Sequence, residues 1–268
     1  MSVYRIDHVL DVEHPAPPGH LLEPPATAAP DWETAAPWFE DGWLMPMGGF
    51  LLRSADRTIL VDAGFGPATD IFERSGEFMK SLDALGVPPE QITDIVVTHL
   101  HLDHLGWLAP TGDPVFPNAR HVCHRADIDW ILDHSGTGPE MAGVRDIVHR
   151  VSDLLVPAEG DRTEIADSVT MRLFAGHTPG NSIVEIDTPD GPLLLIGDTA
   201  HHPAALVEDG WGDLFDADHA GAARSRARLA DEMERTGAVA IGAHFPGTGG
   251  GRITRDAGGD RRWVPVAV

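Results

Sequence analysis

Thr98-His99-Leu100-His101-Leu102-Asp103-His104-Leu105-Gly106 is the most informative stretch of the sequence. It follows the apolar run Ile95-Val96-Val97. Four side chains that can bind a metal occupy six positions of it. His99 and His101 lie two residues apart, so a helix would point them to opposite sides. A strand that runs into a tight loop can instead turn successive side chains inward. The stretch therefore predicts a metal site made of imidazole and carboxylate, which are ligands that zinc takes at about 2.0–2.2 Å.

The alternative is a polar loop with incidental histidines, since the chain contains 15 of them. Four potential ligands packed so tightly at the end of a buried strand argue against that alternative. Cys123 is the only cysteine, which excludes an intrachain disulfide and a zinc site built of several thiolates. Any metal must therefore be held by nitrogen and oxygen.

The composition is that of a soluble globular protein, with 42% hydrophobic and 23% charged residues in 268. Its 19 Lys and Arg against 42 Asp and Glu give a net charge of -23, which repels phosphate backbones and anionic membranes. We expect a small-molecule substrate, no nucleic acid and no membrane partner, and a homodimer is left open. We see neither a signal peptide nor a run long enough to span a membrane, so we expect a cytoplasmic location.

Residues 1–268 are expected to form a single domain, with a segment rich in proline and aromatic residues at about 11–47. Residues 1–10 predict an opening strand, and the prolines of 11–37 predict an irregular segment. Its aromatic side chains either overhang a pocket or fill the core.

Strands and helices are expected to alternate along the rest of the chain. Strands are expected at 49–53, 58–62, 94–98, 119–123, 164–174 (two strands), 183–186, 193–196, 238–241, 252–255 and 263–266, and helices at about 68–85, 125–133, 141–151 and 218–236. A hairpin that ends in aspartate, followed by a strand that ends in histidine, occurs in both halves of the chain. This pattern indicates a weak internal duplication within an α/β fold whose sheets are covered by helices.

Further ligand candidates share the context of the first cluster. His177, Asp198 and His244 each follow an apolar run and have glycine or proline beside them. Any one of them alone is better explained as a residue of a hydrogen-bonded turn. Their joint recurrence favours convergence on one site.

Together these residues resemble the metallo-β-lactamase superfamily of hydrolases, over roughly residues 48–244. The motifs that carry the resemblance are His99-Leu-His101-Leu-Asp103-His104, Gly176-His177-Thr178-Pro179-Gly180, Gly197-Asp198-Thr199 and His244. The resemblance implies a four-layer αβ/βα sandwich with two divalent metal ions at one sheet edge.

The resemblance also implies a role for each residue of the site. One metal would be held by His99, His101 and His177, the second by Asp103, His104 and His244, with Asp198 bridging the two and Asp62 supporting the ligand loop. Zinc is the expected metal, although iron, manganese and cobalt accept the same ligands. A hydroxide between the two ions would attack a small ester, a lactone or a related acyl or phosphoester group.

The long-range layout is most similar to the lactonase and organophosphate-hydrolase-like branch. Many lactonases of this family place a tyrosine between the later ligands, whereas Tyr4 is the only tyrosine here. We predict that His201, three residues after Asp198, replaces it as a catalytic residue, and that Asp103 orients the hydroxide. The predicted pocket walls are Trp43, Met45, Met47, Trp107, His202, Trp211, Phe215 and Phe245, although any one of these residues alone is better explained by packing in the core.

Other functions compete with this prediction. A glyoxalase II-like thioesterase and a mononuclear iron sulfur dioxygenase use the same fold. A nuclease of the superfamily is disfavoured by the negative charge. A non-catalytic metal-binding module is disfavoured because a closed structural site needs only four ligands.

Overall fold

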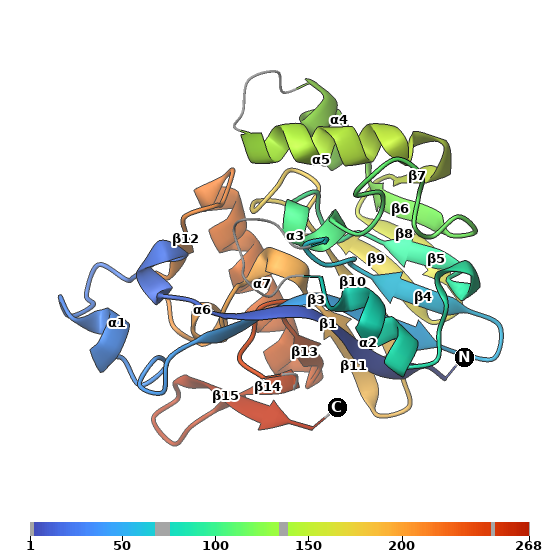
Figure 1. Cartoon of the computed structure of the whole chain (residues 1–268). Coiled ribbons are helices and arrows are strands. Elements are labelled where there is room, and N and C mark those ends of the chain that lie inside the picture. The colour runs from blue at the N-terminus through green and yellow to red at the C-terminus, as the bar shows by residue number, and fades with distance from the viewer. Residues whose placement is uncertain (1–2, 68–75, 134–138, 248–249, 268) are drawn as a thin grey trace.

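The computed structural model describes residues 3–67, 76–133, 139–247 and 250–267, and two large β-sheets form its centre (Figure 1). The first sheet contains, in spatial order, β1 (Arg5–Pro15), β3 (Leu44–Arg53), β4 (Thr58–Val61), β5 (Asp94–Val96), β6 (Arg120–His124) and β7 (Leu155–Ala158). The second contains β15 (Arg261–Val266), β14 (Gly250–Arg255), β13 (Val239–Ile241), β11 (Gly191–Leu195), β10 (Ser182–Thr188), β9 (Val169–Leu173) and β8 (Arg162–Ala166). A small sheet pairs β12 (Gly212–Asp213) with β2 (Leu22–Glu23).

Helices and short 3-10 turns connect the strands. The α-helices of the described ranges are α1 (Trp32–Ala35), α2 (Phe78–Ala84), α3 (Leu102–Leu105), α4 (Arg125–Asp133), α5 (Pro139–Arg150), α6 (Ala204–Val207) and α7 (His219–Thr236). The 3-10 turns are η1 (Pro18–His20), η2 (Pro89–Gln91), η3 (Ser152–Leu154) and η4 (Gly197–Thr199).

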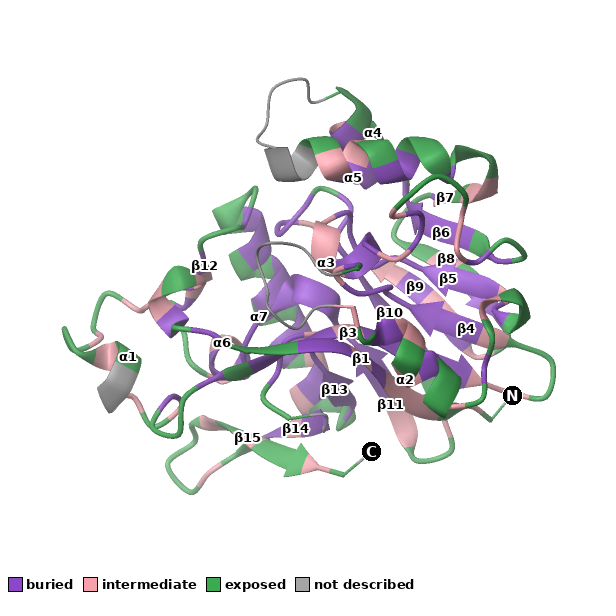
Figure 2. Cartoon of the chain, viewed as in Figure 1, coloured by how far each residue is buried: buried purple, intermediate pink, exposed green. Residues whose placement is uncertain are grey.

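The alternation of side chains along the strands divides the apolar residues among the layers. Leu52 of β3 lies in the cluster between the two sheets, whereas its neighbour Leu51 points to the opposite face and lies in the cluster that contains Phe78 of α2. On the far face of the second sheet, Leu194 of β11 shares a cluster with Leu229 of α7. Figure 2 shows the central strands buried and the outer faces of α2 and α5 exposed. This order of helix, sheet, sheet and helix confirms the predicted four-layer αβ/βα sandwich.

The internal repeat seen in the sequence has a structural basis. In the first sheet, β3 and β4 pair antiparallel and β4 then pairs parallel with β5. In the second sheet, β10 and β11 pair antiparallel and β11 pairs parallel with β13. Asp62 and His99 follow β4 and β5, and Asp198 and His244 follow β11 and β13. Equivalent strands of the two sheets therefore deliver polar residues from their carboxyl ends.

Most of the predicted elements are present, and some of the predicted bounds need correction. The helix α4 has the predicted bounds, and α7 begins after Asp218, whose side chain accepts a hydrogen bond from the backbone of Gly221 at 3.0 Å. Gly237 ends α7 in the left-handed conformation with φ 68°. The helix predicted over 68–85 begins only at Phe78, and residues 68–75 lie outside the described part of the chain.

The prediction of an irregular segment from residue 11 is wrong for its first residues. The strand β1 continues to Pro15, which pairs with Leu44 of β3, because pairing with β3 resumes in a shifted register beyond a bulge at Asp11. The aromatic residues that follow pack on the body of the protein. Trp32 contacts Phe39 edge-on, with ring centroids 5.9 Å apart.

The bulge turns the side chain of Asp11 into the protein, where it is fully buried. Its carboxylate accepts hydrogen bonds from separate segments of the chain. The donors are the backbone N–H groups of Phe65 (2.8 Å), Gly66 (3.1 Å), Gly76 (3.1 Å) and Phe78 (3.0 Å), and Nε1 of Trp107 (3.0 Å). One carboxylate therefore fixes the loop after β4, the start of α2 and the loop after α3.

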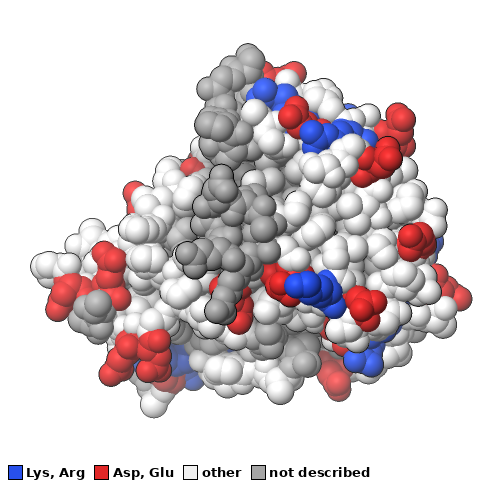
Figure 3. Space-filling view, in the orientation of Figure 1, with Lys and Arg blue, Asp and Glu red and all other residues white. Residues whose placement is uncertain are grey.

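The charged surface is mixed on the face shown in Figure 3, where Lys and Arg side chains lie beside Asp and Glu. No helix in the described ranges is long and apolar enough to cross a bilayer. The absence of a nucleic acid partner stays a prediction from the net charge.

We expect Asp11→Asn to lower the free energy of unfolding by about 2–3 kcal/mol, because an amide NH₂ would then face N–H donors in a buried site. Denaturant unfolding at constant zinc concentration measures the change. The control is Asp209→Asn at an exposed position, which should change stability by less than about 0.5 kcal/mol. Equal effects of the two substitutions would show that the buried contacts of Asp11 do not stabilise the fold.

Candidate metal centre

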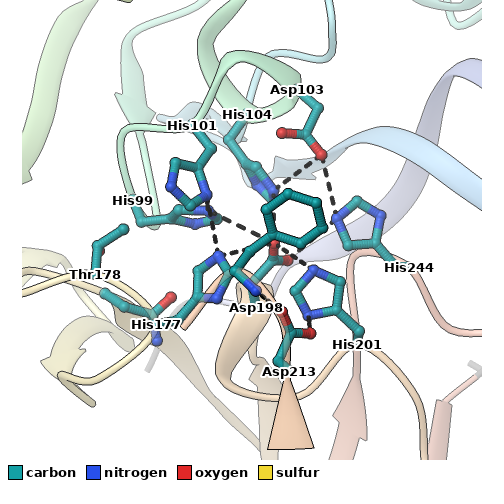
Figure 4. A network of polar contacts seen from close by, with 12 residues as sticks. His99, His101, Asp103, His104, His177, Thr178, Asp198, His201, Asp213 and His244 are labelled. Carbon is teal, nitrogen blue, oxygen red and sulfur yellow. Dashed lines mark hydrogen bonds and ion pairs between the residues drawn. The ribbon is translucent and has the colours of Figure 1, made fainter. Parts of the chain in front are cut away.

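The residues predicted as metal ligands lie together, with their side chains turned toward one space (Figure 4). They come from the loop after β5 and from α3, from the loop after β9, from η4 after β11, and from the loop after β13. The residues are His99, His101, Asp103, His104, His177, Asp198 and His244. Segments more than 140 positions apart in the sequence are thus joined at one edge of the two sheets.

One group is formed by three histidines around a carboxylate. Nδ1 of His101 lies 3.0 Å from Nε2 of His99 and 3.0 Å from Nε2 of His177. Oδ2 of Asp198 lies 3.5 Å from the Nε2 atoms of both His99 and His177. Ligand atoms of all four residues lie within 4.8 Å of one another, a spacing that could hold a metal ion.

A second group adjoins the first and shares Asp198 with it. Nε2 of His244 lies 3.2 Å from Oδ1 of Asp198 and 3.3 Å from Oδ2 of Asp103. Nε2 of His104 lies 3.3 Å from Oδ2 of Asp198 and 3.6 Å from Oδ2 of Asp103. The carboxylate of Asp198 thus belongs to both groups, as a bridging ligand would.

Asp62 supports the ligand loop from behind. Its carboxylate accepts hydrogen bonds from the backbone N–H of Thr98 at 2.7 Å and from the Thr98 hydroxyl at 2.9 Å. Its Oδ2 also lies 2.9 Å from Nδ1 of His104. Asp62 adopts φ 61°, a conformation that is uncommon outside glycine and recurs at functional sites. The backbone is thus bent at the point where it must place a carboxylate under the histidines.

Two other histidines of the centre also contact an oxygen through Nδ1, the ring nitrogen that faces away from the other ligands. Nδ1 of His177 lies 3.2 Å from Asp216, whose second oxygen accepts from Arg226 at 3.0 Å. Nδ1 of His244 lies 2.9 Å from the carbonyl oxygen of Pro46. Metal-binding histidines commonly donate their other N–H to a carboxylate or a carbonyl, which directs the free lone pair toward the ion.

Asp127 joins two ligand-bearing loops, a role that sequence reasoning missed. It is buried, and its carboxylate accepts hydrogen bonds from the backbone of Leu100 (3.0 Å), the hydroxyl of Thr178 (2.8 Å) and the backbone of Gly180 (2.5 Å). Burial raises its pKa, and these hydrogen bonds oppose the rise. Asp127 lies near the start of α4 and has no local signature of this role.

The two groups differ in how strongly their histidines hold protons. Burial lowers the pKa of His99 well below 6.5 and that of His101 to about 3. Burial also opposes the charged forms of His104 and His244, but the carboxylates around each ring together outweigh it, Asp198 and Asp103 for both and Asp62 in addition for His104. The pKa of His104 therefore lies well above 6.5, and that of His244 rises to about 9.

The donor set fits divalent metal ions. Nε2 of His104 and Oδ1 of Asp198 are buried and have no hydrogen-bond partner in the described part of the structure. Imidazole nitrogens lie 3.2–3.5 Å from the carboxylate oxygens of Asp198. This is the arrangement expected of ligands that surround a cation. The roles of these residues as ligands remain a prediction, which this geometry supports.

His201, the predicted catalytic residue, lies against the same carboxylate. Its Nε2 is 3.1 Å from Oδ2 of Asp198, and its ring stacks on that of His244 with centroids 5.1 Å apart. Nδ1 of His201 contacts Asp213, a residue that the sequence analysis did not single out.

Several of the residues predicted as pocket walls pack inside the protein. Trp43, Met45, Met47 and Trp211 belong to one buried cluster, in which the ring of His202 lies 5.3 Å from that of Trp43. Nε1 of Trp43 donates a hydrogen bond to the backbone carbonyl of His244 at 3.0 Å, so this side chain helps to position a predicted ligand.

The remaining predicted wall residues differ in exposure. Phe245 is 2% exposed and its ring contacts that of Trp263 edge-on, so it belongs to the core of the second sheet. Trp107 is partly buried and donates to Asp11. Phe215 is 55% exposed, next to residues that contact the histidines of the centre. Contact of any of these residues with a substrate stays a prediction.

Comparison with known proteins agrees with this geometry. A family profile described as the metallo-beta-lactamase superfamily matches residues 49–244. An N-acyl homoserine lactonase AttM of Azorhizobium caulinodans is 30% identical over 61% of this chain, and the match spans 62% of that protein. The AttM lactonase of Rhizobium johnstonii is 25% identical over 75% of this chain and 82% of its own.

The chain is also similar to solved structures of hydrolases. AidC, a dizinc quorum-quenching lactonase in complex with a product, is 27% identical with a TM-score of 0.74, covering 84% of this chain and 80% of its own. The hydrolase AbOPH has a TM-score of 0.79 at 21% identity over 99% of this chain and 95% of its own, a likeness of fold.

We expect acid to release the metal of the Asp103 group before that of the His101 group. A metal must displace the proton from His244, whose pKa of about 9 makes the apparent affinity fall about tenfold per pH unit below that value. His101, with a pKa of about 3, poses no such competition between pH 6 and 9. Elemental analysis after equilibration with buffered zinc at pH 9, 8, 7 and 6 should show about two ions per chain falling to about one. Loss of both ions at one common pH would contradict this.

Proposed function

The chain belongs to the metallo-β-lactamase superfamily, and we propose that it is a binuclear metal-dependent hydrolase that opens a small lactone or ester. The observation that carries the proposal is the shared carboxylate: Asp198 takes part in both groups of ligand atoms. A structural metal site is closed by four ligands, whereas two adjoining groups with a common carboxylate suit a catalytic pair of ions.

The substrate class is proposed from the relatives. The matched proteins from Azorhizobium caulinodans and Rhizobium johnstonii are N-acyl homoserine lactonases, and AidC is a dizinc lactonase. We infer zinc as the metal from AidC and from the imidazole and carboxylate ligands, which zinc favours. Since Tyr4 is the only tyrosine of the sequence, a residue other than tyrosine must complete the site. A single domain and a cytoplasmic location stay predictions.

The chemistry divides between the ions and the side chains. When bound, the two ions would lower the pKa of a water molecule and polarise the scissile carbonyl group. The side chain of Asp103 is 23% exposed, whereas that of Asp198 is 3% exposed. Asp103 is therefore the carboxylate that incoming water or substrate reaches, and we assign it to orient the attacking oxygen.

His201 is the proposed donor to the oxygen that gains charge as the acyl bond breaks. Burial opposes its charged form, but the carboxylates of Asp213 and Asp198 hold its pKa well above 6.5. The ring then carries a hydrogen on Nε2, the atom 3.1 Å from Asp198 and thus beside both groups of ligands. A positioned histidine can contribute about 10²–10⁴-fold to such a step.

We expect zinc-loaded protein to hydrolyse at least one member of a panel of esters, lactones, thioesters and phosphotriesters. Asp198→Ala and His101→Ala should lose most of the bound metal, by elemental analysis, together with turnover, because each removes a ligand from the shared centre. The exposed His149→Ala is the matched control and should keep both. Full activity in either metal-depleted variant would refute a metal-dependent mechanism. Two bound ions per chain with no turnover on the whole panel would instead favour a non-catalytic metal-binding module.

His201→Ala should keep its metal and lose kcat by about 100-fold, the range expected when a proton donor is removed. Steady-state kinetics on the best substrate of the panel, with elemental analysis of the same sample, measures both. An unchanged kcat would end the assignment of His201 as a catalytic residue.

A further inference from the structure

Asp213 contacts the proposed catalytic histidine on the side that faces away from the metal centre. Oδ2 of Asp213 lies 2.6 Å from Nδ1 of His201, although their orientation departs from an in-line hydrogen bond. Both side chains are buried, at 2% and 6% exposure. Within the described residues, neither of these two atoms has a hydrogen-bond partner of regular geometry. Because a buried polar atom without a partner is costly, each atom depends on this ion-pair contact with the other.

The neighbouring carboxylate has a different task. Asp216 contacts His177, and its charge is balanced by Arg226 at 3.0 Å. Among the described residues, His201 is the only basic side chain in ion-pair contact with Asp213. The carboxylate of Asp216 therefore contacts His177. That of Asp213 contacts His201, as Figure 4 shows.

The N-terminal segment fixes the position of Asp213. The strand β12 pairs antiparallel with β2, so that Asp213 lies opposite Leu22, and the N–H of Leu214 donates to the carbonyl of Leu21 at 2.8 Å. The other oxygen of Asp213 accepts from the backbone N–H of Phe215 at 2.8 Å. The carboxylate is thus held at both ends, with one oxygen on the backbone and the other on His201.

We propose that Asp213, held in place by the pairing of β12 with β2, is a positioning residue that keeps Nδ1 of His201 turned away from the centre and Nε2 turned toward it. The proposal rests on the proposed function, because it concerns the orientation of the residue assigned there as a donor. It also gives a role to the N-terminal segment, which the proposed chemistry does not otherwise use.

The test is an isosteric substitution, Asp213→Asn. The side chain keeps its size, but it has one acceptor oxygen for two donors, the Phe215 N–H and the His201 Nδ1–H. We expect kcat to fall about 10–100-fold with KM and metal content unchanged. In the His201→Ala background the same substitution should cause no further loss of kcat, since the residue that it positions is absent. An equal loss of kcat in both backgrounds, or no loss in either, would overturn the proposal.

The control for a general effect on stability is Asp94→Asn. Asp94 is a buried carboxylate that pairs with Arg57 and Arg120 in the first sheet, away from the metal centre. Its substitution should lower the melting temperature and leave kcat unchanged. A loss of kcat in Asp94→Asn equal to that in Asp213→Asn would show that the effect is one of stability, and would overturn the proposal.

A second readout does not depend on turnover. Imidazole ¹⁵N chemical shifts of the zinc-loaded protein, with the signals of His201 identified by their loss in His201→Ala, should show a hydrogen on Nδ1. Asp213→Asn should move the Nδ1 shift, and Asp94→Asn should leave it in place. An Nδ1 shift that does not respond to Asp213→Asn would overturn the proposal. If no substrate of the panel turns over, the proposed function fails, and this measurement still decides whether Asp213 orients His201.

Discussion

The structure depends on a single crowded carboxylate. Oxygens of Asp198 lie within 3.1–3.5 Å of Nε2 atoms of His99, His104, His177, His201 and His244. Ring nitrogens and carboxylate oxygens can share so small a buried space only if protons or cations lie between them. Protons give one solution, which is why Asp198 raises the pKa of His104 and His244. Divalent ions give the other, and they use the lone pairs that His99 and His101 keep free.

The arrangement of the two sheets brings these polar side chains together. Each sheet contributes a hairpin followed by a parallel strand, and the polar residues follow the carboxyl ends of these strands. The loops beyond the strands are fixed by further buried carboxylates. Asp11 and Asp127 each accept hydrogen bonds from at least two separate segments, and Asp62 holds the stretch from Thr98 to His104. An acidic residue thus takes the place of regular secondary structure where the backbone is irregular.

The sheets, and the grouping of the candidate ligands, could be predicted because the strands and the residues that follow them have local patterns. The cluster from His99 to His104 is dense, and the hairpins and α7 have the alternation, turn residues and caps that short-range physics requires. The roles of Asp11, Asp127 and Asp213 were not predicted, because the distant partners that define these roles lie between 12 and 96 positions away and an isolated aspartate has no local signature. The aromatic residues left two options open. Whether Trp43 fills a core or lines a pocket depends on tertiary packing, which places it in a buried cluster and over the backbone of His244.

Anomalous diffraction from crystals of the zinc-loaded protein at the zinc edge tests the two-metal centre most directly. We expect two peaks about 3.5–4 Å apart, one on each side of the Asp198 carboxylate. One peak would lie among His99, His101 and His177, and the other among Asp103, His104 and His244. A single peak, or peaks away from Asp198, would contradict the claim that this carboxylate joins two metal sites.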